Sequence, residues 1–131
     1  MNNFNVEEKN LLEIAKNAAS KSYSPYSSFP VGAALLTKEG DVYAGANVEN
    51  AAFGSTICAE RAALLHANIH GFRKFKALAI YGAATESPIF PCGACRQMLI
   101  EFGDMKVLLM GTNQKVKKTT LKKLLPMAFK K

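Results

Sequence analysis

The segments "CAERAAL" (Cys58–Leu64) and "PCGACRQ" (Pro91–Gln97) contain all three cysteines of the 131-residue chain. Each segment leads into a stretch with helical spacing of apolar residues, so each places its cysteines near the start of a predicted helix. We expect the first helix to span about 56–68 and the second to begin at Cys92. Clustered thiols at two helix N-termini indicate a metal site or a nucleophile, and the rest of the fold must bring the two helices together.

The sequence before these segments predicts a helix followed by a β-hairpin. Asn5 and Glu8 have the spacing of a capping box, and the helical pattern after them ends near Ser20. The runs "VGAALLT" and "DVYAGANV" flank the residues Lys-Glu-Gly at 38–40. Gly40 accepts a positive φ, so this arrangement is typical of a hairpin turn.

The sequence after the first cysteine alternates strands and helices. Short apolar runs predict buried strands at 76–83 and 106–112, on either side of the second cysteine helix. An edge strand near Val116 and a last helix over about 120–125 complete the order. This order predicts a single α/β domain over residues 1–131, with three α/β/α layers around a mixed central sheet of about five strands.

Composition is typical of a globular protein without a membrane segment. Hydrophobic residues make up 49% of the chain, and no apolar run approaches the roughly 20 residues that span a bilayer. The N-terminal stretch "MNNFNVEEKN" lacks the basic and apolar regions of a secretory signal. We therefore expect a cytoplasmic protein with reduced thiols, in which three cysteines favour a metal or a nucleophile over a disulfide.

The net charge of +7 is concentrated in residues 115–131. Basic segments attract phosphates, but no aromatic residues are interleaved with these lysines as stacking platforms for bases. We interpret the segment as a solvated helix face and a frayed terminus rather than as a nucleic-acid surface.

Cys92 and Cys95 form a C-x-x-C pair, which alone fits a redox pair, a structural zinc site or coincidence. Zinc prefers thiolates and takes four ligands, and Cys58 supplies a third. His66 and His70 lie about 12 Å and 18 Å from Cys58 along the axis of the predicted helix, too far to share its metal. Three protein ligands with an open fourth position are the pattern of a catalytic zinc site.

Glu60 lies two residues after Cys58, in the first turn of its helix, where it can point toward the open metal position. Zinc lowers the pKa of bound water toward about 7, and a neighbouring carboxylate can take the proton. Three thiolates leave an excess negative charge, which the two helix dipoles offset. Arg61 and Arg96 are candidates to donate hydrogen bonds to the thiolate sulfurs.

The spacing C-x-E … P-C-x-x-C matches the zinc deaminase signature, with cysteine in place of the first histidine. Together with "SPYSSFPVGAALL", "GANVENAAFGSTICAER", "SPIFPCGACRQ" and "LLPMAF", it shows that nearly the whole chain resembles the short form of the cytidine deaminase family. The resemblance implies hydrolytic deamination of cytidine and deoxycytidine in pyrimidine salvage. It also implies one zinc ion per subunit, held by Cys58, Cys92 and Cys95, with Glu60 as the proton shuttle.

The resemblance further implies a set of substrate-binding residues. Phe29 resembles the ring that packs on the pyrimidine, and Asn47 with Glu49 resembles the pair that holds the ribose 3′-hydroxyl. Phe129 resembles the aromatic residue that reaches a neighbouring subunit's site in a homotetramer. One departure is Phe53, which stands where some relatives have tyrosine and therefore lacks that hydroxyl.

Three alternatives remain beside this hypothesis. A deaminase of another cytosine nucleoside, such as blasticidin S, would share the zinc motifs, although "NVEN" suits a free ribose. A polynucleotide deaminase is suggested by the basic segment, but a carboxylate at the ribose 3′-oxygen would repel a 3′-phosphate. A structural zinc module would need a fourth protein ligand.

Overall fold

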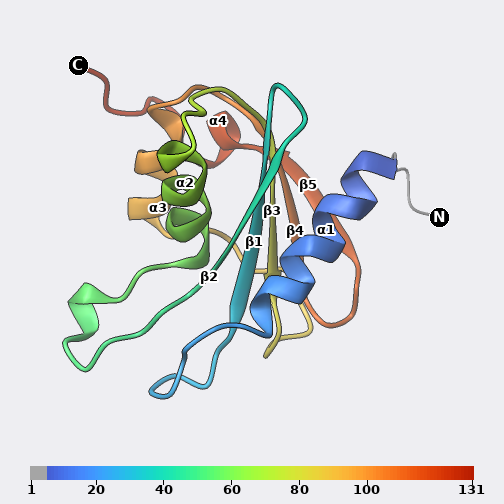
Figure 1. Ribbon diagram of the computed structural model, residues 1–131, viewed down its shortest axis with the longest axis vertical. Helices are drawn as coiled ribbons and strands as arrows, with labels where there is room; N and C mark the ends of the chain where they lie inside the picture. Colours follow the sequence, from blue (N-terminus) through green and yellow to red (C-terminus); the bar gives the residue numbers. More distant parts are fainter. Residues whose placement is uncertain (1–5) are drawn as a thin grey trace.

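A five-stranded mixed sheet with the order β2-β1-β3-β4-β5 forms the middle layer of the protein (Figure 1). The structure is a computed structural model, and it describes residues 6–131. Strands β3 and β4 are parallel, whereas the other neighbouring pairs are antiparallel. The elements are α1 (Val6–Ala19), β1 (Val31–Thr37), β2 (Val42–Ala46), the 3₁₀ turn η1 (Phe53–Ser55), α2 (Ala59–Ile69), β3 (Phe75–Gly82), α3 (Gly93–Ile100), β4 (Lys106–Met110), β5 (Val116–Thr120) and α4 (Leu121–Leu124).

The sheet is covered on both faces, which confirms the predicted three layers. Helix α1 packs on one face, and α2 and α3 lie on the other (Figure 1). Successive side chains of a strand point to opposite faces, so Ala34 and Leu36 join the core under α1. Ala33 and Leu35 join the core under α2 and α3. All seven residues of β1 are buried, as expected for a continuous apolar run between two helical layers.

Two glycines allow the helices to approach the sheet closely. A Cβ atom on Gly32 would lie 1.9 Å from the Ala15 carbonyl oxygen of α1. A Cβ atom on Gly45 would lie 2.4 Å from the Ala63 nitrogen and 2.5 Å from the Ala59 oxygen of α2. Only a residue without a side chain fits at these contacts, so β2 and the cysteine-bearing helix α2 are held together without a gap.

The predicted start of the first cysteine helix at Thr56 is wrong. Helix α2 begins at Ala59, because Ile57 is extended and exchanges backbone hydrogen bonds with Val48, both 3.0 Å long. Cys58 is therefore the N-cap residue rather than part of the helix interior. The predicted hairpin at Gly40 is confirmed, with φ of 101°. Asn5, the predicted capping residue of the first helix, lies outside the described residues.

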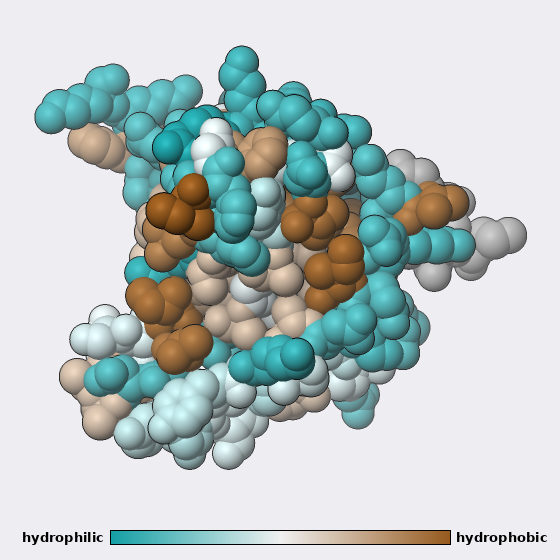
Figure 2. Space-filling model, in the orientation of Figure 1, coloured by the Kyte–Doolittle hydropathy of each residue, from teal (hydrophilic) through white to brown (hydrophobic). Residues whose placement is uncertain are grey.

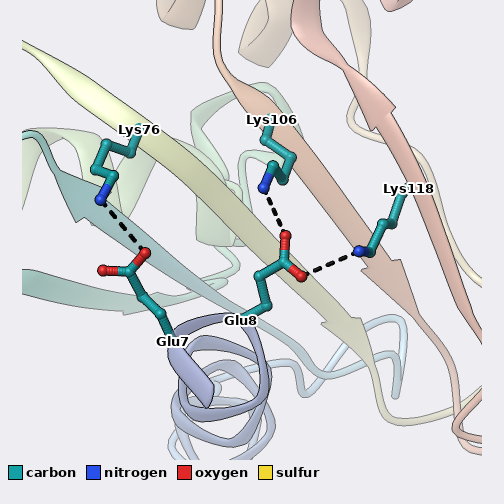
Figure 3. Close-up of polar contacts among 5 residues, drawn as sticks. All are labelled: Glu7, Glu8, Lys76, Lys106 and Lys118. Carbon is teal, nitrogen blue, oxygen red and sulfur yellow. Dashed lines mark hydrogen bonds and ion pairs between the residues drawn. The ribbon is translucent and has the colours of Figure 1, made fainter. Parts of the chain in front are cut away.

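The basic segment belongs to the fold, and the expectation of a solvated helix face is wrong for part of it. Lys118 lies on the edge strand β5 and, with Lys106 of β4, donates to the buried carboxylate of Glu8 at 3.0 and 2.6 Å (Figure 3). Next to this group, Lys76 contacts Glu7 at 3.4 Å. Among the described residues, no helix is both long and apolar enough to cross a membrane.

Candidate active site

The three cysteine sulfurs form one cluster at the N-termini of α2 and α3. Cys58 and Cys92 are the N-cap residues of these helices, and Cys95 is buried in the first turn of α3. The three Sγ atoms lie within 4.8 Å of one another, with 3.3 Å between Cys92 and Cys95 and 3.9 Å between Cys58 and Cys92. Zn–S bonds of about 2.3 Å in a tetrahedron place sulfurs about 3.8 Å apart. The cluster therefore has the donor type and the spacing that a zinc ion requires.

The electrostatics of the cluster also favour a cation. The hydrogen bond from the Cys95 thiol, helped by Arg61, lowers the pKa of Cys58 to about 5. The same interaction raises the pKa of Cys95, and burial raises it further. Without a cation the cluster therefore resists carrying more than one negative charge. A divalent ion supplies the charge that lets all three sulfurs ionise.

Neither histidine joins this cluster, in agreement with the sequence analysis. The three cysteines are the only group of three or more potential metal ligands in residues 6–131. His66 Nδ1 donates to the Ala44 carbonyl at 3.0 Å, and His70 Nδ1 donates to the His66 carbonyl at 2.9 Å. Both rings pack against Tyr43, with ring centroids 5.0 Å away. Among the described residues the cluster therefore offers three protein ligands, so the fourth ligand of a four-coordinate zinc ion would be exogenous.

Glu60 provides a buried carboxylate next to the sulfurs. It is the second residue of α2, it is 5% exposed, and its side chain interacts with Cys95. Burial raises the pKa of Glu60 to about 7, although hydrogen bonds from its own backbone N–H and from Cys95 act in the opposite direction. A carboxyl group that is neither fully protonated nor fully ionised near neutral pH is suited to accept and return a proton.

The two arginines act differently from each other. Arg61 donates from Nη2 to the Cys58 sulfur at 3.8 Å and to the Thr56 carbonyl at 3.3 Å, which agrees with the predicted contact to a thiolate. For Arg96, the predicted donation to sulfur is replaced by two bonds to main-chain carbonyls. Its Nε donates to Pro91 at 2.7 Å and its Nη1 to Leu124 at 2.6 Å. Arg96 therefore fixes the segment that carries Cys92 rather than the charge on sulfur.

Asn47 and Glu49 follow β2 and are buried, with 9% and 5% exposure. Asn47 accepts from the Val31 N–H at 2.9 Å and donates to the Phe29 carbonyl at 3.0 Å. Glu49 accepts from backbone and hydroxyl donors of the loop before Phe29. This second task, holding the loop, was missed in the sequence analysis. The only sequence signal for it is the serine-rich turn "SPYSSFP", whose contacts with Asn47 and Glu49 span 18 to 23 positions.

The aromatic residues near the C-terminus and in the loops are exposed. Phe129 is 75% exposed, and its carbonyl accepts a bond from Gln97 of α3 at 3.3 Å. Phe53 in η1 is 64% exposed, and Phe90 before the C-x-x-C pair is 49% exposed. Phe29 differs from these, because it is partly buried and packs against the core under α2 and α3.

Residues 5–111 match the family model described as the cytidine and deoxycytidylate deaminase zinc-binding region. The chain belongs to the cytidine and deoxycytidylate deaminase family. A cytidine deaminase from Sporosarcina psychrophila is 48% identical over 128 residues, which cover 96% of this chain and 93% of the relative. The crystal structure of a cytidine deaminase from Burkholderia pseudomallei shares 49% identity and a TM-score of 0.89, covering 92% of this chain and 98% of that one. A blasticidin-S deaminase from Bacillus cereus is 28% identical over 138 residues, covering 98% of both chains.

Membership of the deaminase family confirms the resemblance and the α/β fold expected from the sequence. It also confirms zinc as the cofactor, because the matched zinc-binding region contains the three clustered cysteines. The family contains the hydrolytic deaminases, so the chain is an enzyme of that class. The individual roles of Phe29, Asn47, Glu49 and Phe129 stay predictions.

Proposed function

We propose that this chain catalyses the hydrolytic deamination of cytidine and deoxycytidine to uridine and deoxyuridine, with release of ammonia, in pyrimidine salvage. The observation that carries this proposal is the three-sulfur cluster with the buried carboxylate of Glu60 beside it. Reduced thiols are needed to hold the metal, which supports a cytoplasmic location.

The chain's own residues account for the proton transfers of this reaction. When bound, zinc would supply a Lewis acid that lowers the pKa of water, so that the water can lose a proton and attack C4 of the pyrimidine near neutral pH. Glu60 takes a proton from the attacking water and delivers it to N3 of the ring. The same carboxylate then carries the second proton to the amino group that leaves C4 as ammonia. Burial of Glu60 keeps bulk water from competing for these protons.

The remaining hydrogen-bonding capacity of Asn47 and Glu49 supports recognition of a sugar hydroxyl. The Asn47 amide has two N–H donors, and one of them is used by the Phe29 carbonyl. The Glu49 carboxylate has about four acceptor positions, and three are used by Tyr26 and Ser27. One donor and one acceptor are left, which match a hydroxyl that accepts one bond and donates another. A 3′-phosphate would instead be repelled by the negative charge of Glu49.

Several exposed features support assembly into a homotetramer with sites at the subunit interfaces. Leu65 and Ile69 of α2 are 50% and 82% exposed and lie one helical turn apart. Figure 2 shows small, weakly hydrophobic residues in the middle of the face where β2 runs, flanked by strongly hydrophobic side chains. The end of α1 and the residues Ala44–Ala46 of β2 line a hollow of about 670 Å³ on this side. Exposed apolar surface of this kind is typical of a protein–protein interface, which supports the proposed assembly. In that assembly Phe129, which is 75% exposed, would reach a neighbouring site.

The test is the loss of ultraviolet absorbance when purified protein is added to cytidine, with a chelator-treated sample as control. We expect turnover of cytidine and deoxycytidine that is lost with the metal and restored by zinc. Blasticidin S, 3′-CMP and a single-stranded oligonucleotide are assayed in parallel. Preferred turnover of blasticidin S or of the oligonucleotide would replace the proposed substrate with that competitor.

A further inference from the structure

The loop between α1 and β1 is tied to Glu49 mainly through one serine. Ser27 donates its hydroxyl to Glu49 Oε2, and its backbone N–H donates to Glu49 Oε1 at 3.1 Å. The preceding N–H, of Tyr26, donates to the same Oε1 atom at 2.9 Å. The Ser27 hydroxyl and the backbone N–H groups of Tyr26 and Ser27 thus hold both carboxylate oxygens by hydrogen bonds, an arrangement called the grip below. The Ser27 hydroxyl is the first cause of the lowered pKa of Glu49, so this grip favours the ionised form.

The same hydroxyl also fixes the backbone of Phe29. Ser27 Oγ accepts from the Phe29 N–H at 3.0 Å, while the Phe29 carbonyl accepts from Asn47 Nδ2 at 3.0 Å. Between them, Ser28 has a positive φ of 55°, which is uncommon for a residue other than glycine. A side-chain bond across such a residue stabilises the turn. Phe29 is therefore held on both sides by residues that contact the Asn47–Glu49 segment.

We propose that Ser27 is a positioning residue for nucleoside binding. Its hydroxyl donates to Glu49 and accepts from the Phe29 N–H. It therefore orients the Glu49 carboxylate toward the ribose 3′-hydroxyl and the Phe29 ring toward the pyrimidine. The grip leaves Glu49 Oε2 with one open acceptor position, which gives the carboxylate a single direction for a sugar hydroxyl. This proposal rests on the proposed function of the same site.

Two features separate this role from catalysis and from folding. Ser27 has no hydrogen bond to the cysteines or to Glu60, so the proton transfers do not depend on it. Its side chain is exposed, so truncation leaves no buried cavity. Loss of its hydroxyl is expected to act on KM far more than on kcat.

The experiment compares Ser27→Ala, Ser27→Thr and the loop control Ser24→Ala, each with its zinc content and Tm measured. Substrates are cytidine and 2′,3′-dideoxycytidine, which lacks the 3′-hydroxyl. For Ser27→Ala we expect the KM for cytidine to rise at least about tenfold, the loss typical of a hydrogen bond to a charged group, with kcat within about twofold. The KM for dideoxycytidine should rise less, and Ser27→Thr should recover most of the loss because it keeps the hydroxyl.

An unchanged KM in Ser27→Ala would overturn the proposal and leave the proposed function intact. An equal rise for both substrates would also overturn it, because the serine would then not act through Glu49. A Ser24→Ala variant as impaired as Ser27→Ala would show a general loop effect and contradict a specific role. The wild-type rate is measured first, and absence of cytidine turnover there would refute the proposed function itself and this proposal with it.

Discussion

Glu60 interacts with the cluster without being one of its three sulfurs, so its substitution is expected to separate metal binding from turnover. We predict that Glu60→Gln keeps about one zinc per chain and loses turnover by about 10²–10⁴-fold, the usual contribution of general acid–base catalysis. Metal analysis and the cytidine absorbance assay measure the two properties on the same sample. Glu13→Gln, on the exposed side of α1, is the control and should match wild type. Near-wild-type activity in Glu60→Gln would contradict the role of proton shuttle.

The residues that the sequence identified are those whose partners are close along the chain. Glu60 follows Cys58 by two positions, and Cys95 follows Cys92 by three, so helix geometry alone relates them. Arg96 was assigned a sulfur contact, whereas it binds the carbonyls of Pro91 and Leu124. Leu124 is 28 positions away and leaves no local pattern. The grip of Ser27 on Glu49 spans 22 positions and was missed for the same reason.

At the scale of elements, Glu8 ties α1 to strands β4 and β5 (Figure 3). Burial alone would raise the pKa of Glu8, but the hydrogen bonds and charges of Lys106 and Lys118 outweigh it and hold the pKa below its usual 4.5. We predict that Glu8→Gln lowers the free energy of unfolding at pH 7 by about 1 kcal/mol. The expected loss of free energy is modest because Lys106 and Lys118 are 47% and 37% exposed, so solvent screens their charges.

The pH dependence of that loss follows from the direction of the pKa shift. A carboxyl group whose pKa is lower in the folded state stabilises the fold fully above its unfolded-state pKa, near 4.5. The difference between wild type and Glu8→Gln should therefore be constant at neutral pH and shrink as the pH falls through the folded-state pKa. Urea unfolding between pH 7 and pH 3 measures it. Glu7→Gln is the matched control, since Glu7 and Lys76 are 47% and 45% exposed and their pair should contribute little. A difference that grew on acidification would contradict the ion-pair account.

The contact between β2 and α2 gives a second prediction at this scale. Gly45→Ala would place a Cβ atom 2.4 Å from the backbone of Ala63, so α2 must shift away from the sheet. Overpacking typically costs about 1–3 kcal/mol, and here the displaced helix carries Cys58 and Glu60. We expect a lower Tm together with weaker zinc retention against a chelator. Gly54→Ala, whose added Cβ meets nothing within 4 Å, should keep the Tm of wild type. Equal Tm values for the two variants would show that α2 adjusts without cost.

The type of an element was predictable where local chemistry decides it. The boundary of an element was not predictable where a contact with a distant residue decides it. Gly40 marked the hairpin because its positive φ favours glycine. Gly71 and Gly103 also have positive φ and follow the ends of α2 and α3, a position that favours glycine. The start of α2 was placed three residues early, since Thr56 and Ile57 fit a helical pattern. The structure keeps Ile57 extended to pair with Val48, which no local preference indicates.

At the scale of the whole molecule, one chain builds the metal cluster and leaves several aromatic side chains exposed. Cys92 is exposed, and so are Phe53, Phe90 and Phe129. The three layers place these residues on the loops and the C-terminal segment, outside both cores. A pyrimidine bound at the cysteines would therefore meet solvent unless a second copy of the chain covers it. The prediction of a shared site follows from this exposure together with the apolar surface of α2.

Removing residues 128–131 tests this arrangement. The C-terminal segment is anchored to α3 through the hydrogen bond from Gln97 to the Phe129 carbonyl, and Phe129 is 75% exposed. If that ring covers the pyrimidine in a neighbouring subunit, the truncated protein should keep its zinc and its fold while its KM for cytidine rises about tenfold, as expected for one lost aromatic contact. The double variant Lys130→Ala/Lys131→Ala is the control, because it removes the charges and keeps the ring. Light scattering gives the mass of each form, and dilution of the wild type should lower specific activity as subunits separate. A fully active wild-type monomer, or a truncated form with the wild-type KM, would show that the site closes within a single chain.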